Sequence, residues 1–459
     1  MATTAASETR IDGAGDGNEP SRSGSGDCIS NLPDDVLRTI VSLLPTREGA
    51  RTQALSRRWR PVWRAAPLNL ADRDGGRHLS RRTNPREIYD NADAGDSRVD
   101  VWLRSRDFSH LRELELAYGY ERCRTTLPPS VFRLAPALRV ARFGSCRLPP
   151  SLAVDFPHLQ QLTLYRVTLT DETFRAVISG CPALESLLLE MNVGATRLRV
   201  SSPTLRSIGF LSPWEKQGRG DIDDVNELVV EDAPCLDRLL PLNSKYGSTI
   251  IRIISAPKLE ILGSLSHGIV QLDLGTTHFQ KMVAASLTTT MPAVKVLALD
   301  YVAPDLDAVL DFLKCFPCLE TLYLILDPRR FLDPDYENKK NVRKYASLDD
   351  PTECLEHHLK KVALKVYYGR GLEVDFARFF VLNAKVLEIM EFGVVDDCGD
   401  KWRANQNVQL QLEDRASHDS RFEFKRFSWT SFRDFKKHTH DLSMPDPFDS
   451  SFLDGYVTI

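Results

Sequence analysis

A short apolar phrase that recurs between residues 111 and 324 constrains the fold of this chain more than any other feature. The phrase is Pro-x-Leu or Pro-x-Val followed by x-x-Leu-x-Leu, as in PHLQQLTL at residues 157–164. Its third position, here called the anchor, falls at Leu138, Leu159, Leu184, Leu205, Leu236, Leu259, Val294 and Leu319, and at Leu111, where the proline is lacking. Most spacings are 21 to 27 residues, and two are 31 and 35. A unit this short cannot bury its apolar face alone, so the copies must stack.

The period of these units indicates a leucine-rich-repeat solenoid. Within a phrase, the two leucines after the anchor face the interior, and the residues beside them face the other side of the sheet. Residues 171–178, followed by Gly180, and residues 306–316 predict helices. The predicted fold class is therefore α/β, with a parallel sheet on the concave face and helices on the convex face. The two long spacings predict insertions or weak repeats, of which residues 225–230 are one candidate.

The outward-facing strand residues of this solenoid are the predicted target-binding surface. They are Glu113, Glu115, Arg142, Gln161, Thr163, Tyr165, Glu190, Thr321 and Tyr323. The set is mixed in charge, and its two tyrosines suit protein contacts, because tyrosine is enriched among interface hot spots. The alternative is that each is an ordinary exposed strand residue. These concave positions contain no basic cluster that would favour a small phosphate-bearing ligand.

Residues 27–66 predict a separate module of three short amphipathic helices. The first presents one apolar face, formed by Val36, Leu37, Ile40, Val41 and Leu44. Pro33 suits a first helical position, Pro45 ends this helix, and Pro61 is expected to kink the third helix or end it early. Three helices in fewer than forty residues bury little apolar area, so the module is expected to need a partner surface.

This module resembles the F-box in the form common in plants. The matching strings are ISNLPDDVL at residues 29–37, LLPT at 43–46 and LSRRWR at 55–60. The resemblance implies docking to a Skp-like adaptor, which joins the chain to cullin and RING subunits in an SCF ubiquitin ligase. The adaptor-binding residues that it implies are Leu32, Pro33, Val36, Leu37, Ile40, Leu44, Pro45, Leu55 and Trp59.

Residues 47–64 carry six arginines and one glutamate, a local charge of +5. A DNA-binding helix, a solvated basic face and a surface that steers the module toward an acidic adaptor are the three interpretations. The whole chain has a net charge of −4 and no wider basic stripe, so no nucleic acid is expected as a partner.

The remaining segments complete the predicted domain organisation. Residues 352–394 read as strand, helix and strand, would cap the solenoid, and resemble the FBD domain of plant F-box proteins. The predicted segments are a disordered tail (1–26), the F-box (27–66), a linker or loop (71–100), degenerate leucine-rich repeats (101–327), the FBD domain (352–394) and a C-terminal extension (395–459).

The sequence offers no pattern typical of catalysis. Cys315 and Cys318 form a single Cys-x-x-Cys without a second pair, and the motifs of nucleophile elbows and phosphate-binding loops are absent. We therefore expect no enzyme activity, metal or cofactor. Nine scattered cysteines and the lack of a secretory signal predict reduced thiols in an intracellular protein, in the cytoplasm or nucleus. No apolar run is long enough to span a membrane.

These observations together predict a substrate-recognition subunit of an SCF-type ubiquitin ligase, which holds a protein target for ubiquitin-dependent degradation. Two alternatives come from other classes. One is an F-box scaffold that binds the adaptor without promoting degradation. The other is a repeat receptor for a small ligand, which would need a concave pocket with convergent polar groups.

Overall fold

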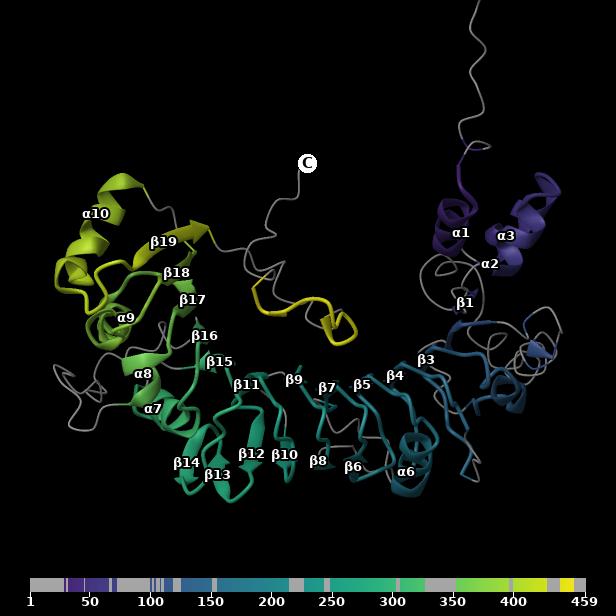
Figure 1. Ribbon diagram of the computed structural model, residues 1–459, viewed down its shortest axis with the longest axis horizontal. Helices are drawn as coiled ribbons and strands as arrows, with labels where there is room; N and C mark the ends of the chain where they lie inside the picture. The colour runs from purple at the N-terminus through teal and green to yellow at the C-terminus, as the bar shows by residue number, and fades with distance from the viewer. Residues whose placement is uncertain are drawn as a thin grey trace, which may run out of the picture.

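The computed structural model describes residues 29, 32–44, 46–65, 68–71, 100, 103–104, 108, 111–118, 125–150, 155–213, 227–242, 248–302, 306–326, 352–395, 399–426 and 438–449. The predicted tail at residues 1–26 and residues 72–99 of the predicted linker lie outside this set. The strands form an arc with the N-terminal helices at one end and an α/β segment at the other (Figure 1).

A sheet of thirteen parallel strands lines the inside of the arc across the described ranges. Its order is β1-β2-β3-β4-β5-β7-β9-β11-β15-β16-β17-β18-β19. The strands are β1 (Leu68–Ala71), β2 (Glu113–Ala117), β3 (Val140–Gly144), β4 (Gln161–Tyr165), β5 (Ser186–Glu190), β7 (Ser207–Leu211), β9 (Arg238–Pro241), β11 (Ile261–Ser266), β15 (Val296–Val302), β16 (Thr321–Leu326), β17 (Lys361–Tyr367), β18 (Ile389–Val394) and β19 (Arg421–Arg426). Parallel stacking of this kind is what the repeated phrase predicts.

The phase of the repeats is confirmed at every anchor. Each of the nine strands from β2 to β16 in this sheet begins two residues after its anchor, as Leu159 precedes Gln161. The anchors are at most 7% exposed. Neighbouring strands pair in register, so equivalent residues of successive repeats form rows on the concave face.

Helices cover two parts of the convex side, as the sequence predicts. They are α6 (Asp171–Ser179) and α7 (Leu306–Cys315). The Thr170 hydroxyl caps α6 by accepting a hydrogen bond from the Thr173 N–H at 3.2 Å, and Gly180 follows the last turn. Helix α6 lies between β4 and β5, helix α7 lies between β15 and β16, and the apolar face of each helix is buried.

The convex side between α6 and α7 carries a second sheet that the sequence analysis did not predict. Its order is β14-β13-β12-β10-β8-β6. The strands are β6 (Arg197–Ser201), β8 (Glu227–Asp232), β10 (Thr249–Ile253), β12 (Ile269–Leu274), β13 (Thr277–Gln280) and β14 (Val283–Ser286). The two long spacings contain β8 and β12 to β14. Of the candidate segment 225–230, the described residues 227–230 lie on the convex strand β8 and not on a concave strand, and Leu228 and Val230 are buried there.

A buried asparagine joins two successive repeats next to this sheet. Asn192 is 2% exposed, and its side chain accepts a hydrogen bond from the Val167 N–H at 2.9 Å and donates one to the Leu164 carbonyl at 3.0 Å. Buried backbone groups that do not pair with a neighbouring strand need other hydrogen-bond partners. Asn192 thus satisfies the backbone where the chain leaves β4.

The far end of the solenoid confirms the predicted strand, helix and strand as β17, α9 (Gly371–Asn383) and β18. The sequence analysis missed β19, which pairs with β18 and extends the sheet. The Phe392 and Phe424 rings stack across this pair at 4.7 Å between centroids. The remaining short helices are η5 (Pro129–Arg133), α8 (Glu353–His357), α10 (Asp400–Gln409) and η7 (Leu412–Asp414).

The N-terminal module consists of α1 (Asp34–Leu43), α2 (Thr46–Arg51), η1 (Thr52–Ala54) and α3 (Trp59–Ala65). The expectation that Pro61 would kink or end the third helix is wrong. Pro61 lies in the first turn of α3, where the N–H that proline lacks would have no helical partner, and the helix continues to Ala65. The following strand β1 pairs with β2, which attaches the module to the solenoid.

Candidate functional site

The N-terminal module has an apolar core of its own. Leu37 and Val41 from α1 pack against Trp59 and Val62 from α3, and all four are at most 9% exposed. Outside this core, the Arg58 side chain donates hydrogen bonds to Asp34 Oδ1, at 2.9 Å from Nε, and to the Leu32 carbonyl. The segment before α1 is therefore fixed to the start of α3. Arg58 is thus part of the module's own structure.

The predicted adaptor-binding residues divide into two groups. Val36, Ile40 and Leu55 are 42%, 37% and 67% exposed, although each side chain is large and apolar. Val36 and Ile40 lie one turn apart on α1, so they share a face of that helix. Large apolar side chains on the surface of a small module are typical of a protein-binding site.

Leu37 and Trp59 do not belong on this surface. Both were predicted to face the adaptor, but they form the core of the module, because the turn of α1 that exposes Val36 directs Leu37 inward. Pro33 is exposed, Leu32 and Leu44 are partly buried, and Pro45 lies outside the described residues. Ile29, which the predicted set omits, is 54% exposed.

The concave face brings the predicted target-binding residues into rows. Glu115, Arg142 and Thr163 are aligned across β2, β3 and β4. Glu113, Gln161 and Thr321 belong to the row before them, and Tyr165 and Glu190 are paired between β4 and β5. Apart from Glu190 and Tyr323, these residues are partly exposed. All nine lie on the same face of the sheet.

Two of the nine are not accessible. Glu190 is 7% exposed, because the neighbouring strands place Tyr165 and Leu211 on either side of it. Tyr323 is 1% exposed, although it lies on the concave face. Its ring packs on Phe448, with 5.7 Å between ring centroids, and its hydroxyl donates a hydrogen bond to Asp446 Oδ2 at 2.8 Å. A target cannot contact Tyr323 while this segment is in place.

The segment that covers Tyr323 is residues 438–449, here called the strap. It lies inside the arc across the concave strands (yellow in Figure 1). His440 is the contact at one end: its ring nitrogens hydrogen-bond the hydroxyls of Thr163 at 2.8 Å and Ser186 at 2.7 Å. Burial, with the nearby Arg142, lowers the pKa of His440 to about 4. The ring is therefore neutral near pH 7, with one nitrogen donating and the other accepting.

Arg238 holds the middle of the strap. This arginine, 4% exposed on β9, donates from Nη1 to the Asp441 carbonyl and from Nη2 to the Met444 carbonyl, each at 3.1 Å. Burial lowers the pKa of Arg238, although neighbouring Asp237 and Asp441 oppose the effect. The guanidinium binds two main-chain carbonyls, so this contact does not depend on which side chains the strap carries.

The other end of the strap combines an aromatic anchor with two carboxylates. The Phe448 ring, 2% exposed, packs in an apolar site formed by Leu240, Ile261, Ala298, Tyr323 and Ala363. Lys361 Nζ lies 2.5 Å from Asp449 Oδ1. Burial raises the pKa of Asp446, while hydrogen bonds from Phe448 N–H and the Tyr323 hydroxyl oppose the rise.

Sequence reasoning missed Arg238, Lys361 and the strap itself. One signal was present in the phrase around β7, where Gly209 occupies a concave position. A Cβ at Gly209 would lie 2.5 Å from Thr439 Oγ1 and 2.9 Å from Leu188 Cδ1. A glycine within a strand marks a place where another chain segment approaches closely.

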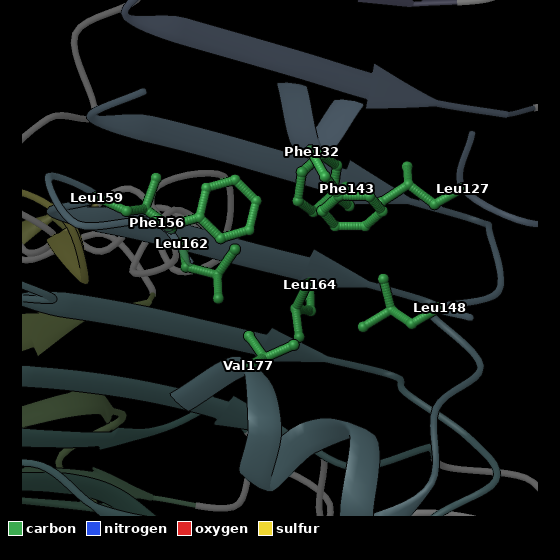
Figure 2. A pocket seen from close by; sticks show the side chains of 9 residues that line it. All are labelled: Leu127, Phe132, Phe143, Leu148, Phe156, Leu159, Leu162, Leu164 and Val177. Atoms are coloured by element: carbon green, nitrogen blue, oxygen red, sulfur yellow. The ribbon is translucent and has the colours of Figure 1, made fainter. Parts of the chain in front are cut away.

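An internal cavity lies between the concave sheet and α6 (Figure 2). Its volume is about 10 Å³, and its walls are apolar side chains, among them Phe143, Phe156 and Leu164, with Val177 contributed by α6. A space of this size holds at most about one water molecule. The cavity therefore lacks the room and the polar groups that a small-ligand site requires.

The described cysteines carry no sign of a redox or metal site. Cys146, Cys181, Cys235, Cys315, Cys318 and Cys354 are free thiols. Burial raises the pKa of Cys315 to about 12, which keeps this thiol protonated. Among the described residues, no group of three or more His, Cys, Asp or Glu side chains has metal-binding geometry. The helices described here are all too short or too polar to cross a bilayer.

Comparison with known proteins assigns three parts of this architecture. An F-box domain model matches residues 29–70, a model of the LRR repeats of the FBD-associated F-box protein At5g56370 matches residues 99–324, and an FBD model matches residues 348–392. The resemblances inferred from the F-box strings and from the strand-helix-strand segment are thus confirmed.

Three relatives from Arabidopsis thaliana show how far the similarity extends. The putative FBD-associated F-box protein At3g50710 is 31% identical over 403 residues, which cover 80% of this chain and 92% of that protein. The F-box/FBD/LRR-repeat protein At5g22660 is 27% identical over 82% of this chain and 91% of its own length. The match to the putative F-box/LRR-repeat protein At3g28410, at 32% identity, spans 36% of this chain and only 38% of that protein. The chain therefore belongs to the plant family of F-box proteins that carry leucine-rich repeats and an FBD domain.

Proposed function

We propose that this protein is the target-binding subunit of an SCF-type ubiquitin ligase. The N-terminal module binds a Skp-like adaptor and, through it, the cullin and RING subunits. The concave face of the repeats holds a protein target. The observation that carries the proposal is the exposure of Val36, Ile40 and Leu55 on a module whose own core is complete without them. Burial of apolar area of this kind is the main driving force of protein association.

The contribution of this chain to ubiquitin transfer is positional. The helical module that carries the adaptor surface is attached to the concave sheet, because β1 follows α3 and pairs with β2. A target bound to the repeats is thereby kept near the enzyme that carries ubiquitin, which raises its effective concentration. The proposal assigns no catalytic residue to this chain and leaves the transfer chemistry to the other subunits.

The experiment that tests the proposal is purification of the tagged full chain from plant cells in which the proteasome is inhibited. We expect the adaptor, a cullin and a RING subunit to co-purify. Recovery of the adaptor without a cullin would favour the F-box scaffold that does not promote degradation. Recovery of neither, from a chain that remains folded, would overturn the proposal.

A further inference from the structure

The strap occupies the surface that the proposed function assigns to a target. It contacts Gln161, Thr163 and Tyr323, which are three of the nine residues predicted to bind the target. Its contacts extend from β4 to β17, across most of the concave sheet. A target must therefore displace the strap to reach Tyr323 and to take over the hydrogen bonds that Gln161 and Thr163 make with His440.

The strap binds the concave face in the way that a linear peptide binds a protein surface, and it does not add a strand to the sheet. Apart from the helical His438, it consists of turns and irregular backbone, and none of its described residues pairs with the concave sheet as a strand. Its main-chain carbonyls accept hydrogen bonds from Arg238, while single side chains enter separate positions on the face. A peptide from another protein can make each of these contacts, because none requires a covalent link to this chain.

The concave face also shows which chemistry it selects. At one end, Thr163 and Ser186 form a site for a neutral hydrogen-bonding ring, occupied by His440. At the other end, the apolar site for Phe448 lies beside Lys361 and the Tyr323 hydroxyl, which bind carboxylates. The strap meets the second requirement with the sequence Asp-Pro-Phe-Asp at residues 446–449.

We propose that the concave face is a binding site for a linear acidic peptide with an aromatic anchor, and that the strap is its intramolecular occupant. The target peptide carries an aromatic residue flanked by carboxylates and displaces the strap. The strap thus limits target binding in the free chain. This inference deepens the proposed function, since it names the chemistry of the target.

The test uses the full chain and a fluorescein-labelled peptide with the sequence of residues 438–449, here called the strap peptide. One opened variant is Phe448→Ala, which removes the strap's anchor and leaves the concave face unchanged. A second, Asp446→Asn/Asp449→Asn, removes the two carboxylates that flank Phe448 at nearly constant volume. We expect the strap peptide to bind either folded variant at least tenfold more tightly than it binds the wild type, because the wild-type strap competes at high effective concentration.

Two controls define the site. A strap peptide with alanine at the Phe448 position is expected to lose at least tenfold in affinity for the opened variant. Adding Gly209→Ala to the opened variant is expected to weaken binding similarly, because the new Cβ would meet Thr439 at 2.5 Å. The inference would be overturned if the strap peptide bound neither opened variant. It would also be overturned if the peptide bound the wild type and the variants with equal affinity.

Adaptor binding measured on the same samples separates this inference from the proposed function. The strap does not contact the described residues of the N-terminal module, so the opened variants are expected to retain the adaptor at wild-type affinity. Loss of peptide binding with the adaptor retained counts against the peptide site alone. Failure of every sample, wild type included, to bind the adaptor counts against the ligase proposal alone.

Discussion

The double substitution Val36→Glu/Ile40→Glu is expected to weaken binding of a Skp-like adaptor at least 100-fold. Both side chains are exposed on α1, so the glutamates remain hydrated in the free module and its core of Leu37 and Trp59 is unaffected. In the complex, the same carboxylates would be buried without partners, which costs several kcal/mol. A 100-fold loss corresponds to about 2.7 kcal/mol. Titration calorimetry with purified adaptor measures it.

Val408→Glu is the matched control for this experiment. Val408 is also an apolar side chain on a helix and is 76% exposed, but it lies on α10 near the far end of the solenoid. We expect this variant to bind the adaptor like the wild type. Unchanged affinity in the Val36/Ile40 double variant, with helix content preserved, would show that α1 is not the adaptor surface.

The affinity of the strap peptide for an opened variant is expected to fall by about 20-fold between pH 7 and pH 5 through His440 alone. The pKa of His440 is lowered to about 4 in the bound state, from an ordinary value of 6.5. Protonation therefore favours the released peptide. The affinity of the strap peptide is therefore highest above pH 6.5 and falls as the pH decreases from 6.5 toward 4. Fluorescence anisotropy at a series of pH values follows this loss.

A strap peptide with glutamine in place of His440 isolates this effect. Glutamine offers a donor and an acceptor to Thr163 and Ser186 but does not titrate in this range. Asp446 acts in the opposite direction, because burial raises its pKa, and it is present in both peptides. The difference between the two titrations therefore belongs to His440. Parallel curves for the two peptides would contradict the hydrogen-bonded, neutral ring.

The concave sheet was predictable because each repeat carries its own signal. The anchor at Leu159 and the alternation that follows it specify the position and the facing of β4 without reference to distant residues. The helix α6 was predictable for a similar reason, since the pattern of residues 171–178 and the stop signal at Gly180 are local. Val36 and Ile40 were found through a contiguous motif.

The features that sequence reasoning missed depend on contacts between distant segments. Thr163 and His440 are separated by 277 positions, so no local pattern indicates that they meet. The convex sheet was missed because β8 carries the same apolar alternation as a concave strand, and only its neighbours decide which layer it joins. Leu37 and Val36 are adjacent in the motif, and the motif alone does not show which of them faces inward.

Hydrogen exchange of the full chain, with and without a saturating Skp-like adaptor, tests most directly whether the exposed apolar side chains of the N-terminal module are a binding surface. We predict slower exchange in residues 32–65 on adding the adaptor and unchanged exchange in the concave strands from β4 to β17. A stable complex in which residues 32–65 exchange as in the free chain, with protection only in the concave strands, would contradict this account.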